Sequence, residues 1–577
     1  MQTSTPHILE LAGGKKFIMK TAFATLMEQL PGKRLKGLTF RSPFTIPSGI
    51  VTTVSSTIAR IALEIPEIGF LTTKTLSIEP RAGYREPVLH EYHPGCFVNA
   101  VGLANPGAVQ FRDTMRPLLP LHDSKPLVIS IMGQNPEEFL ECALILEPIA
   151  DAFELNFSCP HVKGAGQCVG SDPDAVTKTL RLLSRKIHKP VIPKLSPNLG
   201  DISGMARVCE QEGADALCLI NTVGPGMAMD TDGNPVLTNV VGGLSGSGIL
   251  PMGLKAVKEA ASAVRIPIIA AGGIATAEDV HAYLKAGASF FAIGSALAGM
   301  TTSEVATFFA ALVRDLSNED GNGPSPVIIR STASRTSYSK TRVTENIGVG
   351  GGIFRISLEK GPVCDPGKFF FLRLPDIGEK PFSPARDTAP VYLVRAVGPF
   401  TRALEKLKPG DTIFMRGPYG KGYPEPNPAT RVVLIGGGTG AAPVLLAARR
   451  WSAMVAKGFF GFSDRITEDF ARELQSLVPD AVLAVDSTHR VGEVVTALKA
   501  DLAKCPETYS DCIVFLCGPS AMMQAAMEAL GRGNVERKRI FIAREDVMRC
   551  GIGLCGSCGT RTGLRSCTDG PVMGPDE

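Results

Sequence analysis

Neither sign of charge dominates this sequence. Sixty Lys and Arg residues against 56 Asp and Glu residues leave a formal net charge of +4 over 577 residues. A charge this small, spread over that length, forms no focused basic surface for a phosphate backbone. We therefore expect no nucleic-acid partner.

The first thirty residues lack a long apolar run. Glu10 and Glu28 interrupt mildly apolar sequence, so no stretch has the length of a signal peptide or a membrane span. The fourteen cysteines also lack the spacing of a secreted disulfide scaffold. These absences predict a soluble protein with no membrane partner, in a reducing compartment, by default the cytoplasm.

The chain is too long for one hydrophobic core. At roughly 100 to 200 residues per domain, its length predicts about three to five domains. The composition is that of a globular protein, with 44% hydrophobic and 20% charged residues. No internal repeat is visible, so we expect the domains to differ from one another.

The first half alternates short apolar runs with longer segments of helical period. Between Leu38 and Met300 the runs are GFLTTKT, PLVISIM, AFELNF, PVIPKL, DALCLI, IPIIAAGG and SFFAIGSA. This number of strand and helix repeats predicts a parallel (β/α)8 barrel rather than an open sheet. Six polar or glycine positions stand where runs end, on the barrel face that holds active sites: Lys74, Asn156, Lys194, Asn221, Gly272 and Gly294.

Composition changes mark the other boundaries. A barrel domain over 1–315 is followed by SNEDGNGPSP, which predicts a linker over 316–326. Turn-rich runs such as IFRISLEKG, KFFFLRL, VYLVRAVG and DTIFMRG then predict an antiparallel β-barrel over 327–428. The run RVVLIGGGTGAAPVLLAARR begins an α/β nucleotide-binding domain over 429–544, and 545–577 remains as a cysteine-rich tail.

Four cysteines of the tail stand as C-x4-C-x2-C followed by a fourth: Cys550, Cys555, Cys558 and Cys567. This is the plant-type ligand pattern of a [2Fe–2S] cluster, and the glycines between the cysteines let backbone amides approach the sulfurs. A zinc knuckle or a disulfide pair is the alternative. Structural zinc sites usually have two C-x2-C pairs, and only Cys555 and Cys558 have that spacing. The pattern therefore favours an electron-transfer protein.

Glycine-bearing turns follow the last strands of the predicted barrel. They are AAGGIAT with Gly272 and Gly273, AIGSAL with Gly294 and Ser295, and a third turn, GGLSGSG, over 242–248. Each alone is consistent with a tight turn. Together, at the final loops of a barrel, their bare amides predict a cradle for the phosphate of a cofactor.

The strand-ending segment LNFSCPH places the Cys159 thiol beside Ser158, Asn156 and His161. A lone cysteine is more often a buried apolar filler. In combination with TTKT, FVNAVGLANPG, PKLSPN and INTVGPG, however, the segment resembles the dihydroorotate dehydrogenases that bind FMN in a barrel. The resemblance covers nearly all of residues 38–300.

The resemblance implies specific roles in the first half. FMN contacts are implied for Ser48, Gly49, Lys74, Thr75, Asn156, Lys194, Ile220, Gly246, Gly272, Gly273, Gly294 and Ser295. Substrate contacts are implied for Lys74, Asn99, Asn156, His161, Asn221 and Thr222, with the backbone of Val101, Gly102 and Leu103 receiving a carboxylate. Amide side chains suit a pyrimidine because each offers a donor and an acceptor. Cys159 matches the catalytic base, although a free thiol of pKa about 8.5 needs nearby positive charge or donors to ionise.

The second half resembles the electron-transfer subunit that partners the NAD-linked class of these enzymes, itself similar to ferredoxin reductases. Lys380, Pro381, Phe382 and Ser383 match an Arg-Pro-x-Ser element that binds FAD, with Lys replacing Arg and losing its bidentate fork. Further FAD matches are Arg395, Gly398, Thr401 and the turn 417–420. Gly436, Gly438 and Ala441 form a G-x-G-x-x-A dinucleotide signal, and Cys517, Gly518 and Pro519 match a nicotinamide-side motif that alone would indicate a strand-ending turn.

The resemblance implies a fusion of both subunits that oxidises dihydroorotate to orotate. Electrons would pass from FMN through the [2Fe–2S] cluster to FAD and NAD+, because the cluster carries one electron at a time and nicotinamide takes only a hydride. The alternatives are an NAD(P)H-dependent uracil or thymine reductase, whose family also contains SCPH, and a non-catalytic electron carrier. Either NAD or NADP could be the electron acceptor. Asp464 or Asp486 is suited to bind the ribose hydroxyl of NAD, whereas Arg465 is suited to bind the extra phosphate of NADP. We also expect a homodimer formed through the barrel.

Overall fold

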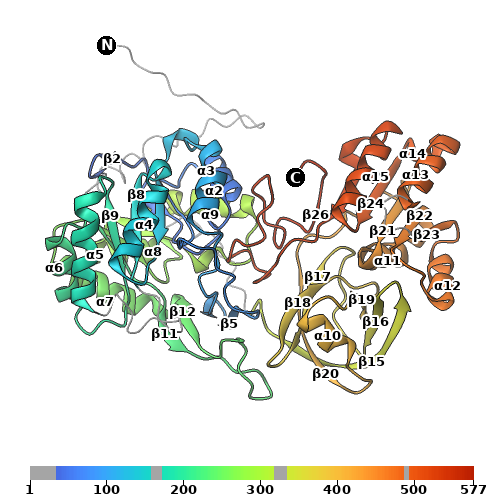
Figure 1. Cartoon of the computed structure of the whole chain (residues 1–577), viewed down its shortest axis with the longest axis horizontal. Helices are drawn as coiled ribbons and strands as arrows, with labels where there is room; N and C mark the ends of the chain where they lie inside the picture. The colour runs from blue at the N-terminus through green and yellow to red at the C-terminus, as the bar shows by residue number, and fades with distance from the viewer. Residues whose placement is uncertain (1–33, 158–171, 318–333, 486–492) are drawn as a thin grey trace, which may run out of the picture.

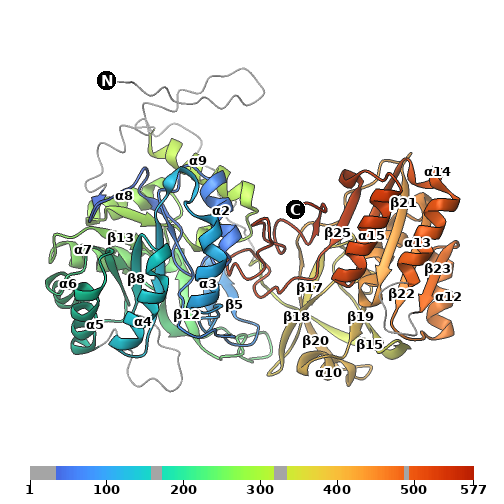
Figure 2. The ribbon, with the colours of Figure 1, turned by 45° about the horizontal axis from the view of Figure 1, so that its top comes forward.

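The computed structural model describes residues 34–157, 172–317, 334–485 and 493–577. A barrel domain, coloured blue to green, lies at one end of the molecule, and the yellow and orange domains of the second half lie at the other (Figure 1). The red C-terminal segment lies between them in both views of the ribbon (Figure 2). Among the described residues, no helix combines the length and apolarity needed to cross a membrane.

Eight parallel strands form the first domain, in the order β3-β14-β13-β10-β9-β8-β7-β4. They are β3 (Phe44–Thr45), β4 (Leu71–Thr72), β7 (Leu127–Ile131), β8 (Ala152–Asn156), β9 (Val191–Leu195), β10 (Leu217–Leu219), β13 (Ile268–Ala271) and β14 (Phe290–Ala292). The two outer strands approach each other where the Gly69 amide donates to the Phe44 carbonyl at 2.9 Å. The predicted (β/α)8 barrel is confirmed in nearly closed form.

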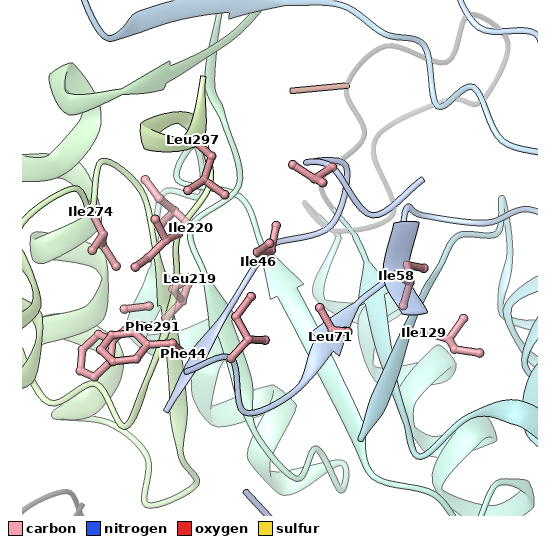
Figure 3. Packing of buried hydrophobic residues seen from close by; sticks show 14 of the residues in the cluster. Phe44, Ile46, Ile58, Leu71, Ile129, Leu219, Ile220, Ile274, Phe291 and Leu297 are labelled. Atoms are coloured by element: carbon pink, nitrogen blue, oxygen red, sulfur yellow. The ribbon is translucent and has the colours of Figure 1, made fainter. Parts of the chain in front are cut away.

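Helices surround this barrel: α2 (Ser55–Glu64), α3 (Ala108–Met115), α4 (Pro136–Leu146), α5 (Pro173–Lys186), α6 (Ile202–Gln211), α7 (Leu250–Ala261), α8 (Ala277–Ala286) and α9 (Thr302–Leu316). Side-chain caps fix several helix starts, with complete capping boxes at Thr276 and Thr301. The core includes the tilted ring pair of Phe44 and Phe291, whose centroids are 5.9 Å apart (Figure 3). Helix starts and core packing together hold the strand ends in place around the barrel mouth.

An antiparallel sheet, for which no sequence pattern was identified, adjoins the barrel mouth. Its order is β11-β12-β6-β5, with β5 (Leu89–His93), β6 (Cys96–Asn99), β11 (Val223–Gly226) and β12 (Gly242–Gly246). The prediction of a turn over 242–248 is therefore corrected, because its first five residues form a strand. The glycines allow close approach to β6: a Cβ on Gly246 would collide with the Gly95 carbonyl.

The second half contains an antiparallel and a mostly parallel sheet. The first has the order β18-β17-β20-β15-β16-β19, with β15 (Ser339–Gly350), β16 (Ile353–Leu358), β17 (Phe369–Leu374), β18 (Gly378–Phe382), β19 (Val391–Arg395), β20 (Thr412–Tyr419) and the helix α10 (Pro399–Glu405). The second has the order β23-β22-β21-β24-β25-β26, with β21 (Arg431–Gly437), β22 (Val455–Phe462), β23 (Ala481–Val485), β24 (Cys512–Cys517), β25 (Ile540–Ala543) and β26 (Val572–Met573). Its helices are α11 (Ala441–Arg450), α12 (Glu468–Leu477), α13 (Glu493–Lys504), α14 (Pro506–Tyr509) and α15 (Ser520–Arg532). Both predicted folds of this half are confirmed.

The segment 545–577 joins the parts of the molecule. On the barrel side, the Val51 amide donates to the Leu554 carbonyl at 2.7 Å and Thr53 Oγ1 donates to the Cys555 carbonyl at 2.8 Å. On the other side, the buried Arg416 donates from Nη1 to the Cys550 carbonyl at 3.0 Å. Close to its end, the segment forms β26, which pairs antiparallel with β25. The cysteine-rich segment is therefore held by both halves at once.

Candidate functional site

A cavity of about 530 Å³ opens at the carboxyl ends of the barrel strands. It is lined by all the FMN positions proposed from the sequence: Ser48, Gly49, Lys74, Thr75, Asn156, Lys194, Ile220, Gly246, Gly272, Gly273, Gly294 and Ser295. The proposed substrate positions Asn99, Val101, Gly102, Leu103, Asn221 and Thr222 line the same cavity. Predicted site residues that are far apart in the sequence of the first half thus line one cavity.

The glycines in the cavity wall are required by close contacts. Gly272 and Gly273 have φ values of +124° and +78°, where side chains are strained. A Cβ on Gly273 would lie 2.9 Å from Cβ of Leu250, and one on Gly294 would lie 3.0 Å from Cγ of Pro47. These bare backbone turns fit a phosphate group, which approaches amides closely where no side chain intervenes.

Polar side chains form a connected row along another wall. The Asn221 amide donates to Asn156 Oδ1 at 3.3 Å, and the Asn156 amide donates to Thr75 Oγ1 at 3.0 Å. Thr75 Oγ1 is 2.9 Å from Ser48 Oγ and 3.0 Å from Oγ of the fully buried Ser130. Hydrogen bonding thus fixes the amides before any ligand binds. Ser130 was not among the predicted site residues, because it lies inside a strand and not after one.

A buried ion pair lies beside the same wall. Lys194 Nζ is 3.7 Å from Glu154 Oε1, and the two side chains are only 6% and 5% exposed. Burial alone would lower the pKa of the Lys194 ammonium, but Glu154 and Cys218 outweigh burial and raise it above its ordinary value. Lys194 therefore presents a positive charge to the cavity. Such a charge suits an anionic, electron-rich cofactor.

The predicted base lies outside the described residues. Cys159 belongs to the segment 158–171, together with Ser158 and His161, so their proposed roles rest on the sequence. The neighbouring Asn156 and Phe157 are described, and Asn156 lines the cavity.

The four tail cysteines lie together in the interior. All four are buried, and the sulfurs of Cys558 and Cys567 are 3.3 Å apart. Backbone amides of Gly553 and Cys555 donate to the sulfurs of Cys567 and Cys550, at 3.2 and 3.5 Å. The four thiols and the amides directed at them fit a [2Fe–2S] cluster.

Within the described ranges, no group of three or more His, Cys, Asp or Glu side chains is arranged to hold a metal ion. A [2Fe–2S] cluster differs from such a site because each iron takes two cysteines. The fit therefore rests on the set of four thiols and on the amides around them.

The cysteine segment also reaches the barrel cavity. Leu554 and Cys555 line it together with the predicted cofactor residues. The spacing of the cysteines carries no information on this position, because the contact joins residues about 500 positions apart in the chain. One predicted cluster ligand thus borders the space that fits a flavin.

A second cavity of about 370 Å³ lies in the other half. Its wall includes Pro381, Phe382, Ser383, Arg395, Thr401 and Cys517, all predicted from the sequence, and Thr439, Gly440 and Glu545, which were not. Burial raises the pKa of the Glu545 carboxyl, while the Arg395 guanidinium opposes that shift. A cationic side chain beside the glycine turn after β21 is suited to a dinucleotide diphosphate.

The remaining nucleotide-site predictions lie around this cavity and not in its wall. Gly436 lies within β21, and Gly438 follows that strand with a φ of +55°. Gly518 and Pro519 follow β24. Lys380 extends elsewhere: its Nζ pairs with Glu86 of the barrel domain at 2.9 Å, and its side chain is 48% exposed. The structure therefore shows a lysine that connects the two halves at the position where a diphosphate contact was predicted.

Comparison with known proteins agrees with this architecture. The dihydroorotate dehydrogenase family matches residues 32–307, and the iron–sulfur cluster binding domain of dihydroorotate dehydrogenase B matches residues 545–577. The catalytic subunit of dihydroorotate dehydrogenase B (NAD(+)) from Pyrococcus horikoshii is 41% identical over 265 residues, which are 46% of this chain and 85% of that protein. The subunits of the same name from Methanothermobacter thermautotrophicus and Methanosarcina mazei are 36% and 37% identical, over 44% and 47% of this chain and 84% and 88% of those proteins.

These relatives match only the barrel half, whereas the cluster-binding domain lies at the other end of the same polypeptide. One chain therefore combines a dihydroorotate dehydrogenase barrel with an iron–sulfur cluster binding domain. With its fold, its cavity and its cysteine segment, this protein belongs to the dihydroorotate dehydrogenase family of oxidoreductases.

Proposed function

We propose that this protein oxidises (S)-dihydroorotate to orotate in pyrimidine biosynthesis and delivers the electrons to NAD+ within one chain. The observation that carries the proposal is the shared wall of the barrel cavity. The predicted flavin and pyrimidine residues line it together with Cys555, a predicted cluster ligand. A substrate oxidised in this space would thus lie near the start of an electron path.

Different residues of the first half would bind the substrate and transfer its proton. The amides of Asn99, Asn156 and Asn221, with the Thr222 hydroxyl, would hold the pyrimidine edge. Backbone amides of Val101, Gly102 and Leu103 would hold the substrate carboxylate. Cys159 would take the proton from C5 of dihydroorotate, as a positioned general base.

The cofactors are FMN in the barrel cavity, a [2Fe–2S] cluster on Cys550, Cys555, Cys558 and Cys567, and FAD in the second cavity. When bound, these groups would supply hydride acceptance at FMN, one-electron transfer at the cluster and hydride transfer to NAD+ at FAD. Lys194, kept charged by Glu154, supports electron-rich flavin in the first site. Arg395 and the turn after β21 support the dinucleotide in the second.

The cluster segment is well placed to connect these sites. Its Cys555 end is hydrogen-bonded to the barrel through Thr53, and its Cys550 end to the antiparallel sheet through Arg416. Arg416 is fully buried, with Nε and Nη2 donating to Glu379 at 2.9 and 2.5 Å. Buried pairs of this kind hold a fixed geometry because breaking them is costly.

A pyrimidine reductase remains the second candidate, because its family shares the SCPH sequence around Cys159 and His161. The two substrates differ at one group, the carboxylate that dihydroorotate has and dihydrouracil lacks. A site with amides arranged for that carboxylate discriminates strongly against an analogue without it. The presence of Val101, Gly102 and Leu103 in the cavity wall supports dihydroorotate.

We predict that dihydroorotate is preferred over dihydrouracil by at least about a hundredfold in kcat/KM, on the order of 2.7 kcal/mol. The reason is the carboxylate contact, which only dihydroorotate makes. Steady-state rates with both compounds and NAD+ as acceptor measure the ratio. Comparable rates, or faster reduction of uracil by NADH or NADPH, would favour the reductase.

A further inference from the structure

The residue before the first cluster cysteine contacts the wall of the substrate cavity. Arg549 Nη2 donates to the Ala82 carbonyl at 2.7 Å, and Nη1 donates to the Tyr84 carbonyl at 3.4 Å. Its Nε lies 3.5 Å from Glu86 Oε1, and the arginine side chain is only 16% exposed. One guanidinium thus binds three positions of the segment Ala82–Glu86.

The segment bound by Arg549 packs directly on the turn proposed to receive the substrate carboxylate. The Tyr84 amide donates to the Val101 carbonyl at 3.1 Å. A Cβ on Gly102 would lie 2.7 Å from the Tyr84 amide nitrogen, and one on Gly83 would lie 2.8 Å from Cβ of Ala104. The two stretches touch with no spare space, so a shift of one displaces the other.

Arg549 can act as a fixed support because its own backbone is held. The next residue, Cys550, accepts a hydrogen bond at its carbonyl from the buried Arg416, which is anchored on Glu379. The Ala82–Glu86 segment is held on its other side by Lys380, whose Nζ is 2.9 Å from Glu86 Oε2. Glu86 therefore keeps one cationic partner if Arg549 is replaced.

We infer that Arg549 is a positioning residue for the substrate site, through which the electron-transfer half holds the carboxylate-binding turn in its binding shape. The inference rests on the proposed function, because it concerns how dihydroorotate and orotate are held. It requires no contact between Arg549 and the ligand. The arginine acts on affinity through the Ala82–Glu86 segment and the turn Val101–Leu103.

The test is orotate affinity in flavin- and cluster-loaded full-length protein, measured by titration calorimetry. Loss of charge-assisted hydrogen bonds to the segment should weaken orotate binding by about tenfold in Arg549→Ala. KM for dihydroorotate should rise in parallel, while the limiting rate of flavin reduction at saturating substrate stays within about twofold. Arg549→Lys should recover part of the affinity, because it keeps the charge beside Glu86 and loses the fork.

Arg561→Ala is the matched control, since Arg561 is exposed in the same C-terminal segment. It should bind orotate like the unaltered protein. Unchanged orotate affinity in Arg549→Ala would overturn the inference, and so would a fall in the limiting rate with no change in affinity. Failure of the unaltered protein to bind orotate would instead refute the proposed function, so the two failures are distinguishable.

Discussion

Replacing Cys555 by serine is expected to separate the two half-reactions. Dihydroorotate should still reduce the flavin of the barrel, whereas NAD+ reduction falls by at least about a hundredfold, because a thiolate ligand of the one-electron carrier is lost. Cys555 is the cysteine that lines the barrel cavity, so its loss affects the point where electrons leave the first half. Anaerobic absorbance spectra and NADH formation measure the two steps separately.

A matched control for this change is Cys505→Ser. Cys505 is a half-buried free cysteine of the second half and lies in neither cavity wall. This control should keep iron content and NAD+ turnover. Undiminished NAD+ turnover in Cys555→Ser protein without bound iron would rule out the proposed path.

Replacing Cys159 by alanine should abolish most flavin reduction without loss of the flavin. The rate should fall by roughly 10² to 10⁴, the usual contribution of a positioned general base. Orotate affinity should stay nearly unchanged, because the thiol is assigned to proton removal, whereas the amides of Asn99, Asn156 and Asn221 are assigned to binding. Stopped-flow mixing with dihydroorotate measures the rate, and Cys168→Ala in the same stretch of sequence is the control.

If the Cys159→Ala variant reduces its flavin within about threefold of the unaltered rate, a residue other than Cys159 must act as the base. Ser158 and His161 would then be the next candidates, since each carries a group able to accept a proton. The pH dependence of flavin reduction would distinguish them, because imidazole titrates near neutrality and a hydroxyl does not.

The barrel and its cavity were predictable because their signals are local. Six predicted positions lie at or close after the carboxyl ends of parallel strands, which share one face of the barrel: Lys74, Asn156, Lys194, Asn221, Gly272 and Gly294. The strand β3 (Phe44–Thr45) was not identified, because Pro43 and Pro47 flank it and leave no apolar run to recognise. The glycine run over 242–246 suggested a turn, since its strand conformation depends on pairing with β6, far away in the sequence.

Contacts between the halves had no local signal. The Cys555 spacing predicts a cluster ligand but not its place in the wall of the barrel cavity. The motif around Lys380 predicts a diphosphate contact, whereas its ammonium is paired with Glu86 across the junction. Long-range electrostatic pairing of this kind cannot be derived from residue spacing, because it depends on how complete domains pack.

In the proposed function, one chain carries electrons from dihydroorotate to NAD+. The most direct measurement is anaerobic mixing of purified protein, of known flavin and iron content, with dihydroorotate and excess NAD+. We predict FMN, FAD and about two irons per chain, and one NADH formed for each orotate. Orotate formation without NADH, a single kind of flavin, or zinc in place of iron would contradict the claim.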